Sequence, residues 1–231
     1  MVVYRVEFLN LDFVKARLLT APASSQHHQA EAGGLLSHTN DVVRYALLEL
    51  EHWNTIFRIP SLNQNNEDVV VAGVLHDISK IGDPIGRNFY VPTVLKSGKV
   101  SDKKPYEREE QAFKCASTLA RVEDAVRSAA PSSSSPNLSL VSAVGELLDR
   151  NIGALREGEL SLLLVNALAP ELYKLLSSTV RSMIRLHDGA YAGRGDLNGH
   201  ETVAWFALHT ADMLSSREVR WRTPVGALPT V

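Results

Sequence analysis

The apolar residues of this chain recur mainly every three or four positions, which is the period of an amphipathic helix. A first long helix is predicted from residue 33 onward, on the apolar positions Leu36, Val42, Val43, Ala46, Leu47 and Leu50. The continuous apolar run 69–75, taken alone, would also suit a buried strand. We assign it to a second helix because the three-to-four spacing continues to Ile81, after which Gly82 and Pro84 end it.

The rest of the chain is predicted to be helical as well, apart from irregular stretches. No period is sustained over 86–104, so we expect a long loop there, and loops of that length in compact domains are usually functional. Further helices are expected at 107–126, 138–148, 159–168, 170–186 and 201–215, the fourth with Pro170 in its first turn. The strand candidates are 2–8 and 89–91.

These elements predict an all-α fold, a helical bundle with a long loop after the second helix and a helical insertion. The insertion covers about 127–160 and contains a serine-rich linker at 131–136. We expect a main domain at 26–216, an N-terminal segment at 1–25 and a peripheral C-terminal tail at 217–231. A length of 231 residues is enough to bury a core, and the single cysteine, Cys115, excludes an intramolecular disulfide.

Charge and hydropathy argue against two classes of partner. The formal net charge is −2, so we expect no duplex nucleic acid partner. The most apolar stretch, 160–168, is shorter than the ~20 residues of a membrane span, so we expect no membrane partner and a cytoplasmic protein. The lysine-rich stretch 96–108 fits either a solvated loop or a surface that attracts phosphate.

Four histidine and aspartate residues stand in distinctive settings. His38 follows a glycine pair in the first helix, His76 and Asp77 are adjacent after an apolar run, and Asp212 lies inside the apolar segment WFALHTADML. Any one of these histidines alone is more typical of an ordinary core residue than of a ligand. Together they favour a metal, because a buried carboxylate is costly without a positive partner, and imidazole and carboxylate groups bind divalent first-row metals.

The segments around these residues resemble the signature of the HD-domain metal-dependent phosphohydrolases, in particular phage and bacterial nucleotide hydrolases. They are GGLLSHTNDVV (33–43), AGVLHDISKIGD (72–83) and LHTADMLSS (208–216). In that family an H…HD…D set from separate helices of a bundle holds the metal. The resemblance implies an HD-domain-like helical bundle in which the metal ligands are His38, His76, Asp77 and Asp212.

The resemblance also implies one divalent metal cofactor, and Mn, Co, Fe, Ni and Zn all accept such ligands. Family members with two or three metals usually carry further histidines after the doublet, whereas this chain has no histidine between Asp77 and Leu186. A single tightly held metal is therefore favoured, and a second, weakly bound Mg or Mn is left open.

Residues near the motifs are candidates for catalysis. Lys80 is one helical turn from His76 and resembles a catalytic position of the family, or else is an exposed lysine at a helix end. Asp83 is a candidate general acid or water-orienting base, or a turn residue before Pro84. His187 would contact phosphate or protonate the leaving group, unless it only caps a helix.

Candidates for substrate binding lie mostly in the expected loop. Arg87, Tyr90 and Lys96 combine positive charge with a ring that can stack on a base, which suits a nucleotide. His209 is a candidate for phosphate contact or for core packing, and the histidine pair 27–28 is a weaker candidate for the border of the cleft.

The sequence thus predicts a metal-dependent phosphohydrolase that acts on a nucleotide, a (deoxy)nucleoside mono- or triphosphate. Two alternatives stay open. One is a phosphodiesterase that acts on RNA ends or cyclic nucleotides, and the other is a non-catalytic metal-binding HD module. The apolar content of the helices also leaves room for a homo-oligomer.

Overall fold

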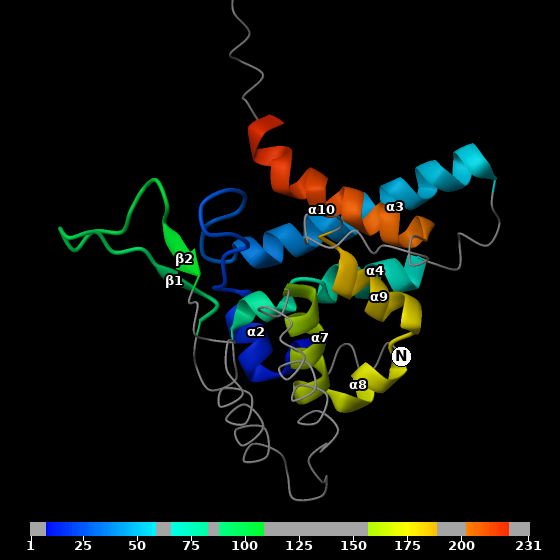
Figure 1. Cartoon of the computed structure of the whole chain (residues 1–231), viewed down its shortest axis with the longest axis horizontal. Coiled ribbons are helices and arrows are strands. Elements are labelled where there is room, and N and C mark those ends of the chain that lie inside the picture. The colour runs from blue at the N-terminus through cyan, green and yellow to red at the C-terminus, as the bar shows by residue number, and fades with distance from the viewer. Residues whose placement is uncertain (1–7, 59–65, 83–87, 109–156, 189–201, 222–231) are drawn as a thin grey trace, which may run out of the picture.

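The computed structural model describes residues 8–58, 66–82, 88–108, 157–188 and 202–221 (Figure 1). This part of the chain is mostly helical, in agreement with the predicted all-α class, and it contains one two-stranded sheet. The helices are α2 (Asp12–Leu18), α3 (Gly34–Phe57), α4 (Asn66–Leu75), the 3-10 helix η2 (Ile78–Ile81), α7 (Glu157–Leu168), α8 (Pro170–Leu175), α9 (Ser178–Leu186) and α10 (Val203–Trp221). The strands are β1 (Tyr90–Pro92) and β2 (Tyr106–Arg108).

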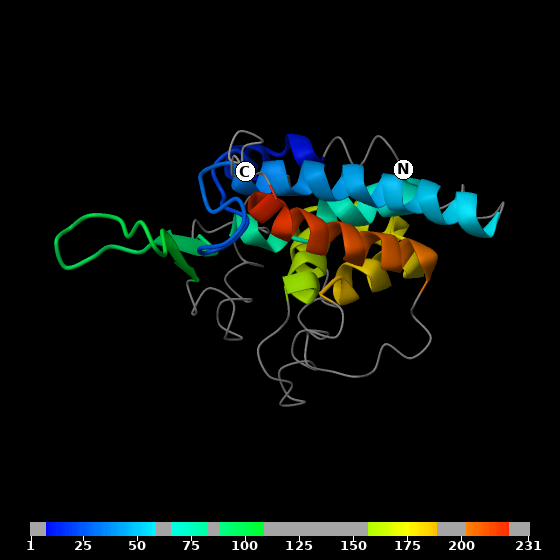
Figure 2. The ribbon, with the colours of Figure 1, turned by 90° about the horizontal axis from the view of Figure 1, so that it is seen from above.

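Helices α3 and α10 lie side by side, and α4 packs against both (Figure 2). Small and branched residues fill this contact, and Val42 of α3 and Ala211 of α10 are fully buried. Gly73 of α4 approaches α3 so closely that a Cβ there would lie 2.9 Å from Cγ2 of Val43. A larger residue would push α4 away from α3, so the glycine lets the C-terminal part of α4 lie close to α3.

Helix α7 packs against α9 and η2. Gly158 of α7 packs against the end of α9, and an added Cβ on this glycine would be 2.0 Å from the carbonyl oxygen of Ile184. The Ser161 hydroxyl donates to the carbonyl oxygen of His76 at 2.7 Å and accepts from the amide of Ser79 at 3.1 Å. These contacts hold the turn after α4 against α7.

Two predicted helices are interrupted. The one predicted through residue 81 changes from α-helix to the 3-10 helix η2 after a turn at His76 and Asp77. There the Ser79 amide donates to a hydroxyl of α7 instead of continuing the helical ladder. The helix predicted at 170–186 is divided into α8 and α9, because Leu176 is extended and the Ser177 hydroxyl caps α9.

The segment after residue 88 is a β-hairpin. Strand β1 pairs with β2 in antiparallel register, Val94 and Val100 form a further bridge, and Gly98 adopts a positive φ of 80° in the turn. Within the predicted loop over 86–104, residues 90–92 form a strand, which confirms the strand candidate at 89–91 to within one residue. Apart from the bridge between Val94 and Val100, residues 93–104 are turns and irregular structure, as predicted. Short runs of β-branched and aromatic residues flank the glycine, and such runs favour a hairpin.

Predictions for the two chain ends and the insertion are tested only in part. The helix predicted from 107 is wrong at its start, where β2 lies, and residues 109–156, with the serine-rich linker, Cys115 and the helix at 138–148, are outside the described residues. Helix α10 extends to Trp221, so residues 217–221, placed in the C-terminal tail from the sequence, continue this helix, because no proline or glycine interrupts the segment. The strand predicted at 2–8 is wrong at Phe8, which is helical, and is otherwise not described. Within the described ranges, no helix has the length and apolar character needed to cross a membrane.

Candidate metal centre and its pocket

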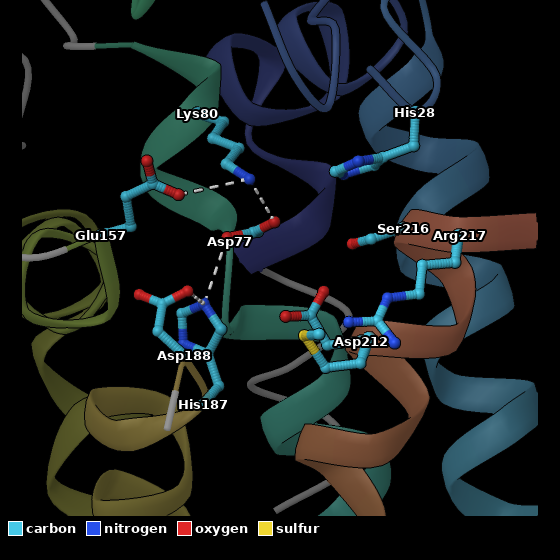
Figure 3. A pocket seen from close by; sticks show the side chains of 10 residues that line it. His28, Asp77, Lys80, Glu157, His187, Asp188, Asp212, Ser216 and Arg217 are labelled. Atoms are coloured by element: carbon cyan, nitrogen blue, oxygen red, sulfur yellow. Dashed lines mark hydrogen bonds and ion pairs between the residues drawn. The ribbon is translucent and has the colours of Figure 1, made fainter. Parts of the chain in front are cut away.

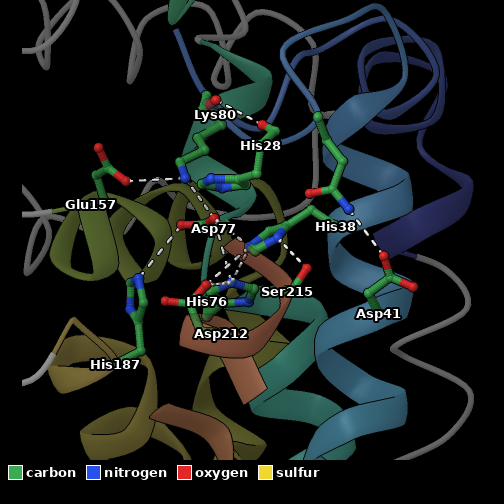
Figure 4. Close-up of polar contacts among 12 residues, drawn as sticks. His28, His38, Asp41, His76, Asp77, Lys80, Glu157, His187, Asp212 and Ser215 are labelled. Atoms are coloured by element: carbon green, nitrogen blue, oxygen red, sulfur yellow. Dashed lines mark hydrogen bonds and ion pairs between the residues drawn. The ribbon is translucent and has the colours of Figure 1, made fainter. Parts of the chain in front are cut away.

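Three helices bring two histidines and two aspartates to one point in the interior (Figure 4). His38 comes from α3, His76 and Asp77 from the turn after α4, and Asp212 from α10. The Nε2 atoms of His38 and His76 are 3.3 Å apart, and each lies 3.4 Å from Oδ2 of Asp77. Oδ1 of Asp212 lies 3.1 Å from Nε2 of His38 and 3.9 Å from Nε2 of His76. The structure therefore brings together the four residues named as metal ligands from the sequence.

The spacing of these atoms suits a divalent ion. Ligand atoms bound about 2.1 Å from a first-row metal lie roughly 3.0–3.4 Å apart in octahedral or tetrahedral geometry. Four of the five distances fall between 3.1 and 3.4 Å, and the one from His76 to Asp212 is longer, at 3.9 Å. The buried group His38, His76 and Asp77 could hold a metal ion, and Asp212 lies beside it.

Hydrogen bonds orient both imidazoles toward the centre. Nδ1 of His76 donates to the carbonyl oxygen of Gly73 at 2.8 Å. Nδ1 of His38 lies 2.9 Å from the buried hydroxyl of Ser215, one turn after Asp212 on α10. A ring with its N–H on Nδ1 presents the Nε2 lone pair that a metal requires. Ser215 was missed at the sequence level, because a serine in an apolar helix carries no signal of its own.

The burial and hydrogen bonding of Asp77 indicate whether these residues fit a cation. Its side chain is 3% exposed, yet Oδ1 has no hydrogen-bond partner among the described residues. Burial opposes ionisation, but Lys80 and His76 nearby hold the pKa of Asp77 well below its ordinary value. Within 3.5 Å of this oxygen lies Nε2 of His187, but a buried, ionised carboxylate with an oxygen that accepts no hydrogen bond is still costly, and a bound divalent cation would lower that cost. The residues present therefore fit a metal.

Lys80 places a positive charge beside this centre. Its Nζ lies 2.6 Å from Oδ2 of Asp77 and 3.3 Å from Oε2 of Glu157, the first residue of α7 (Figure 4). Burial favours the neutral amine, but the two carboxylates raise the pKa of Lys80 well above its ordinary value. The lysine is buried and paired, so it is not an exposed lysine at a helix end. Glu157 was not predicted, since acidic residues are common in first helical turns.

His187 contacts the other oxygen of Asp77 (Figure 3). Its Nδ1 donates to the carbonyl oxygen of Ile184 at 2.8 Å, while Nε2 lies 3.5 Å from Oδ1 of Asp77 and 3.3 Å from Oδ1 of Asp188. Burial favours the neutral ring, but these carboxylates raise the pKa of His187 to about 10. His187 also caps the end of α9, and with Asp188 and Asp212 it forms a second group that could hold a metal ion.

A pocket of about 330 Å³ opens beside the centre (Figure 3). Its wall contains side chains of both charges, contributed by Asp77, Lys80, Glu157, His187, Asp188, Asp212 and Arg217. His28 also lines it, with its ring 4.9 Å from the ring of His38. Burial, with His38 and Lys80 nearby, lowers the pKa of His28 to about 4, so this imidazole is neutral at pH 7. The volume is within the range of small-molecule sites.

The other residues named for substrate binding or catalysis have different fates. Tyr90 lies on β1 near Lys80, and burial raises the pKa of Tyr90 to about 12. Lys96 is exposed in the hairpin and lines neither this pocket nor the one described below. Asp83 and Arg87 lie outside the described residues.

His209, a candidate for phosphate contact, lies outside the pocket, whereas Arg217, which was not a candidate, lines it. Nδ1 of His209 lies 2.6 Å from the carbonyl oxygen of His187, and its ring stacks on Trp205. His209 thus supports the end of α9 and does not line the pocket. Arg217, assigned to a peripheral tail from the sequence, lines the pocket because α10 continues through it.

No protein-family model, curated protein or solved structure matches this chain. The resemblance to the HD-domain family therefore stays a prediction from the residue pattern.

Proposed function

We propose that the chain is a divalent-metal-dependent phosphohydrolase of the HD-domain type that acts on a nucleotide. The observation that carries this proposal is the convergence of four residues, beside a pocket that contains a buried lysine. The distances of 3.1–3.9 Å join the two histidines to each other and to the two aspartates, in the set His38, His76, Asp77 and Asp212. A purely structural core would not bring two histidines and two carboxylates together, because each buried charge opposes folding.

The chemistry divides between the metal and the side chains around it. A bound divalent ion supplies charge that polarises a phosphoryl oxygen and lowers the pKa of a bound water. Lys80, held by Asp77 and Glu157, lines the pocket and would bind a non-bridging phosphate oxygen. The imidazolium of His187 would donate the proton on Nε2 to the leaving oxygen.

The charge of the pocket supports metal dependence. Its lining includes four carboxylates, those of Asp77, Glu157, Asp188 and Asp212. The cationic groups that face them are Lys80, His187 and Arg217. A nucleotide phosphate entering the metal-free pocket would meet this excess of negative charge, which a divalent ion would offset. A mono- or triphosphate of a nucleoside is the substrate that we favour.

The test is a panel of ribo- and deoxyribonucleoside mono- and triphosphates, with cyclic nucleotides and short RNA. Each is incubated with Mn²⁺ or Co²⁺ and the products are separated by anion exchange. We expect phosphate or triphosphate release by wild-type protein and none by His76→Ala. His52→Ala is the matched control, because His52 lies exposed on α3 away from the centre, and it should retain full activity.

Three outcomes would change the proposal. Full turnover after exhaustive chelation would refute metal dependence. Release from RNA ends or cyclic nucleotides alone would favour the phosphodiesterase alternative. A silent panel with stoichiometric bound metal would favour a non-catalytic metal-binding module.

A further inference from the structure

A second pocket, of about 270 Å³, adjoins the first, and Lys80 lines both of them. It lies between the β-hairpin, the end of α2 and η2. The hairpin contributes Tyr90 and Tyr106, and the chain around the end of α2 contributes Thr20. None of these groups belongs to the metal centre.

One face of the hairpin forms an aromatic wall of this pocket. Pro92 and Tyr106 are directly opposite each other in the antiparallel register, and Tyr90 lies two residues before Pro92. Because side chains alternate between the two faces of a strand, these three rings share one face, and all three line the pocket. The amide of Tyr106 donates to the carbonyl oxygen of Ser25 at 3.1 Å, which ties the hairpin to the loop after α2.

Polar groups interrupt the apolar lining. The guanidinium of Arg17 donates to the side-chain oxygen of Asn88, which orients the amide. The Asn88 side chain is exposed, and Tyr90 and Tyr106 are half-buried, so their polar ends lie at the border of this pocket. Aromatic rings with a few polar groups at the border are the composition of a site for a planar, polar ring.

We propose that this second pocket receives the heterocyclic base of a nucleotide whose phosphate lies in the first pocket. The inference rests on the proposed function for the place of the phosphate. Lys80 joins the two spaces, so a ligand with an anionic end and a planar end would extend past this side chain from one pocket to the other. The base would stack on a tyrosine ring and would present its polar edge to the Asn88 amide.

Binding is tested first with free nucleosides, which carry no phosphate to be hydrolysed. Adenosine, guanosine, cytidine, uridine and thymidine are titrated calorimetrically into the full Mn²⁺-loaded chain. We expect at least one to bind, and Tyr106→Leu to weaken it roughly 10-fold through lost stacking. Tyr106→Phe should bind within about 3-fold of wild type, because it keeps the ring. Glu107→Gln is the matched control on the opposite, exposed face of the same strand and should change nothing.

Kinetics separate this inference from the proposed function. Tyr106→Leu should lower kcat/KM for the nucleotide roughly 10-fold through KM, whereas Glu107→Gln should leave both constants unchanged. Nucleotide hydrolysis that is insensitive to Tyr106→Leu and Asn88→Ala would overturn the base pocket while sustaining the hydrolase. If the wild-type chain binds a nucleoside but hydrolyses no substrate, and Tyr106→Leu abolishes that binding, the base pocket is supported and the proposed hydrolase activity is refuted. No nucleoside binding at all would overturn the inference.

Discussion

Replacing Lys80 by methionine would leave Asp77 buried without its closest cation. Nζ and Oδ2 are 2.6 Å apart, and the two side chains are 8% and 3% exposed. Removing one partner of a buried ion pair costs about 3–5 kcal/mol in the free energy of unfolding. Three histidine Nε2 atoms within 3.4–3.5 Å of the carboxylate compensate part of its charge, so we expect the lower value, about 3 kcal/mol. For a domain of this size the melting temperature should fall by roughly 6–12 °C.

The loss should be smaller when a divalent ion is bound, because the ion would then compensate the charge of Asp77. We expect a cost of about 1 kcal/mol in saturating Mn²⁺. By thermodynamic linkage, the difference of about 2 kcal/mol means that Lys80→Met binds the metal roughly 30-fold more tightly than wild type.

The assay is urea unfolding of wild type and Lys80→Met in EDTA and in Mn²⁺. Lys174→Met is the matched control, because Lys174 pairs with Glu171 at the same i,i+3 spacing and at 2.7 Å, but the side chains are 62% and 64% exposed. That variant should lose less than about 1 kcal/mol under either condition. If Lys80→Met in EDTA were no less stable than Lys174→Met, or if Mn²⁺ left its deficit unchanged, the reasoning about the buried carboxylate would be refuted.

Three further substitutions test the surroundings of the centre. Ser215→Ala should weaken Mn²⁺ binding about 10–100-fold by calorimetry, since it removes the partner of a liganding imidazole, whereas Ser216→Ala should change it less than about 3-fold. Gly158→Ala should lower the free energy of unfolding by about 2 kcal/mol or more, because a Cβ would lie 2.0 Å from a carbonyl oxygen of α9, and an unchanged urea midpoint would contradict that approach. In EDTA, wild-type stability should fall between about pH 6.5 and pH 4, because the folded pKa of His28, about 4, is below its ordinary value and the unfolded chain takes up the proton. His28→Gln should lessen this fall, His27→Gln at the exposed neighbour should not, and identical profiles for the two variants would argue against the shift.

The positions of the main helices could be predicted because helical periodicity is local information. The spacing of apolar residues marks α3, α7 and α10, and each lies within a few residues of its expected place, apart from the extensions of α3 and α10. The four residues of the candidate metal centre could be named for a related reason. A charged residue inside an apolar run needs a partner wherever the chain folds, so His76, Asp77 and Asp212 stand out from the order of the residues alone.

The interruptions in secondary structure could not be predicted, because they depend on partners distant in sequence. Ser79 is part of a 3-10 helix where its amide reaches Ser161, 82 positions later. Strand β2 is fastened through Tyr106 to Ser25, so the residues predicted to begin a helix form a hairpin instead. A local period gives no information on such bonds.

The sequence by itself therefore determined a helical protein with an H…HD…D set suited to a metal. Only the tertiary structure decided what surrounds that set. The close approach of α7 to α9 at Gly158 brings Glu157 to Lys80, and the unbroken α10 carries Ser215 to His38. Those meetings depend on how whole helices pack, and packing is set by the shapes of both surfaces together, which no single segment of the chain encodes.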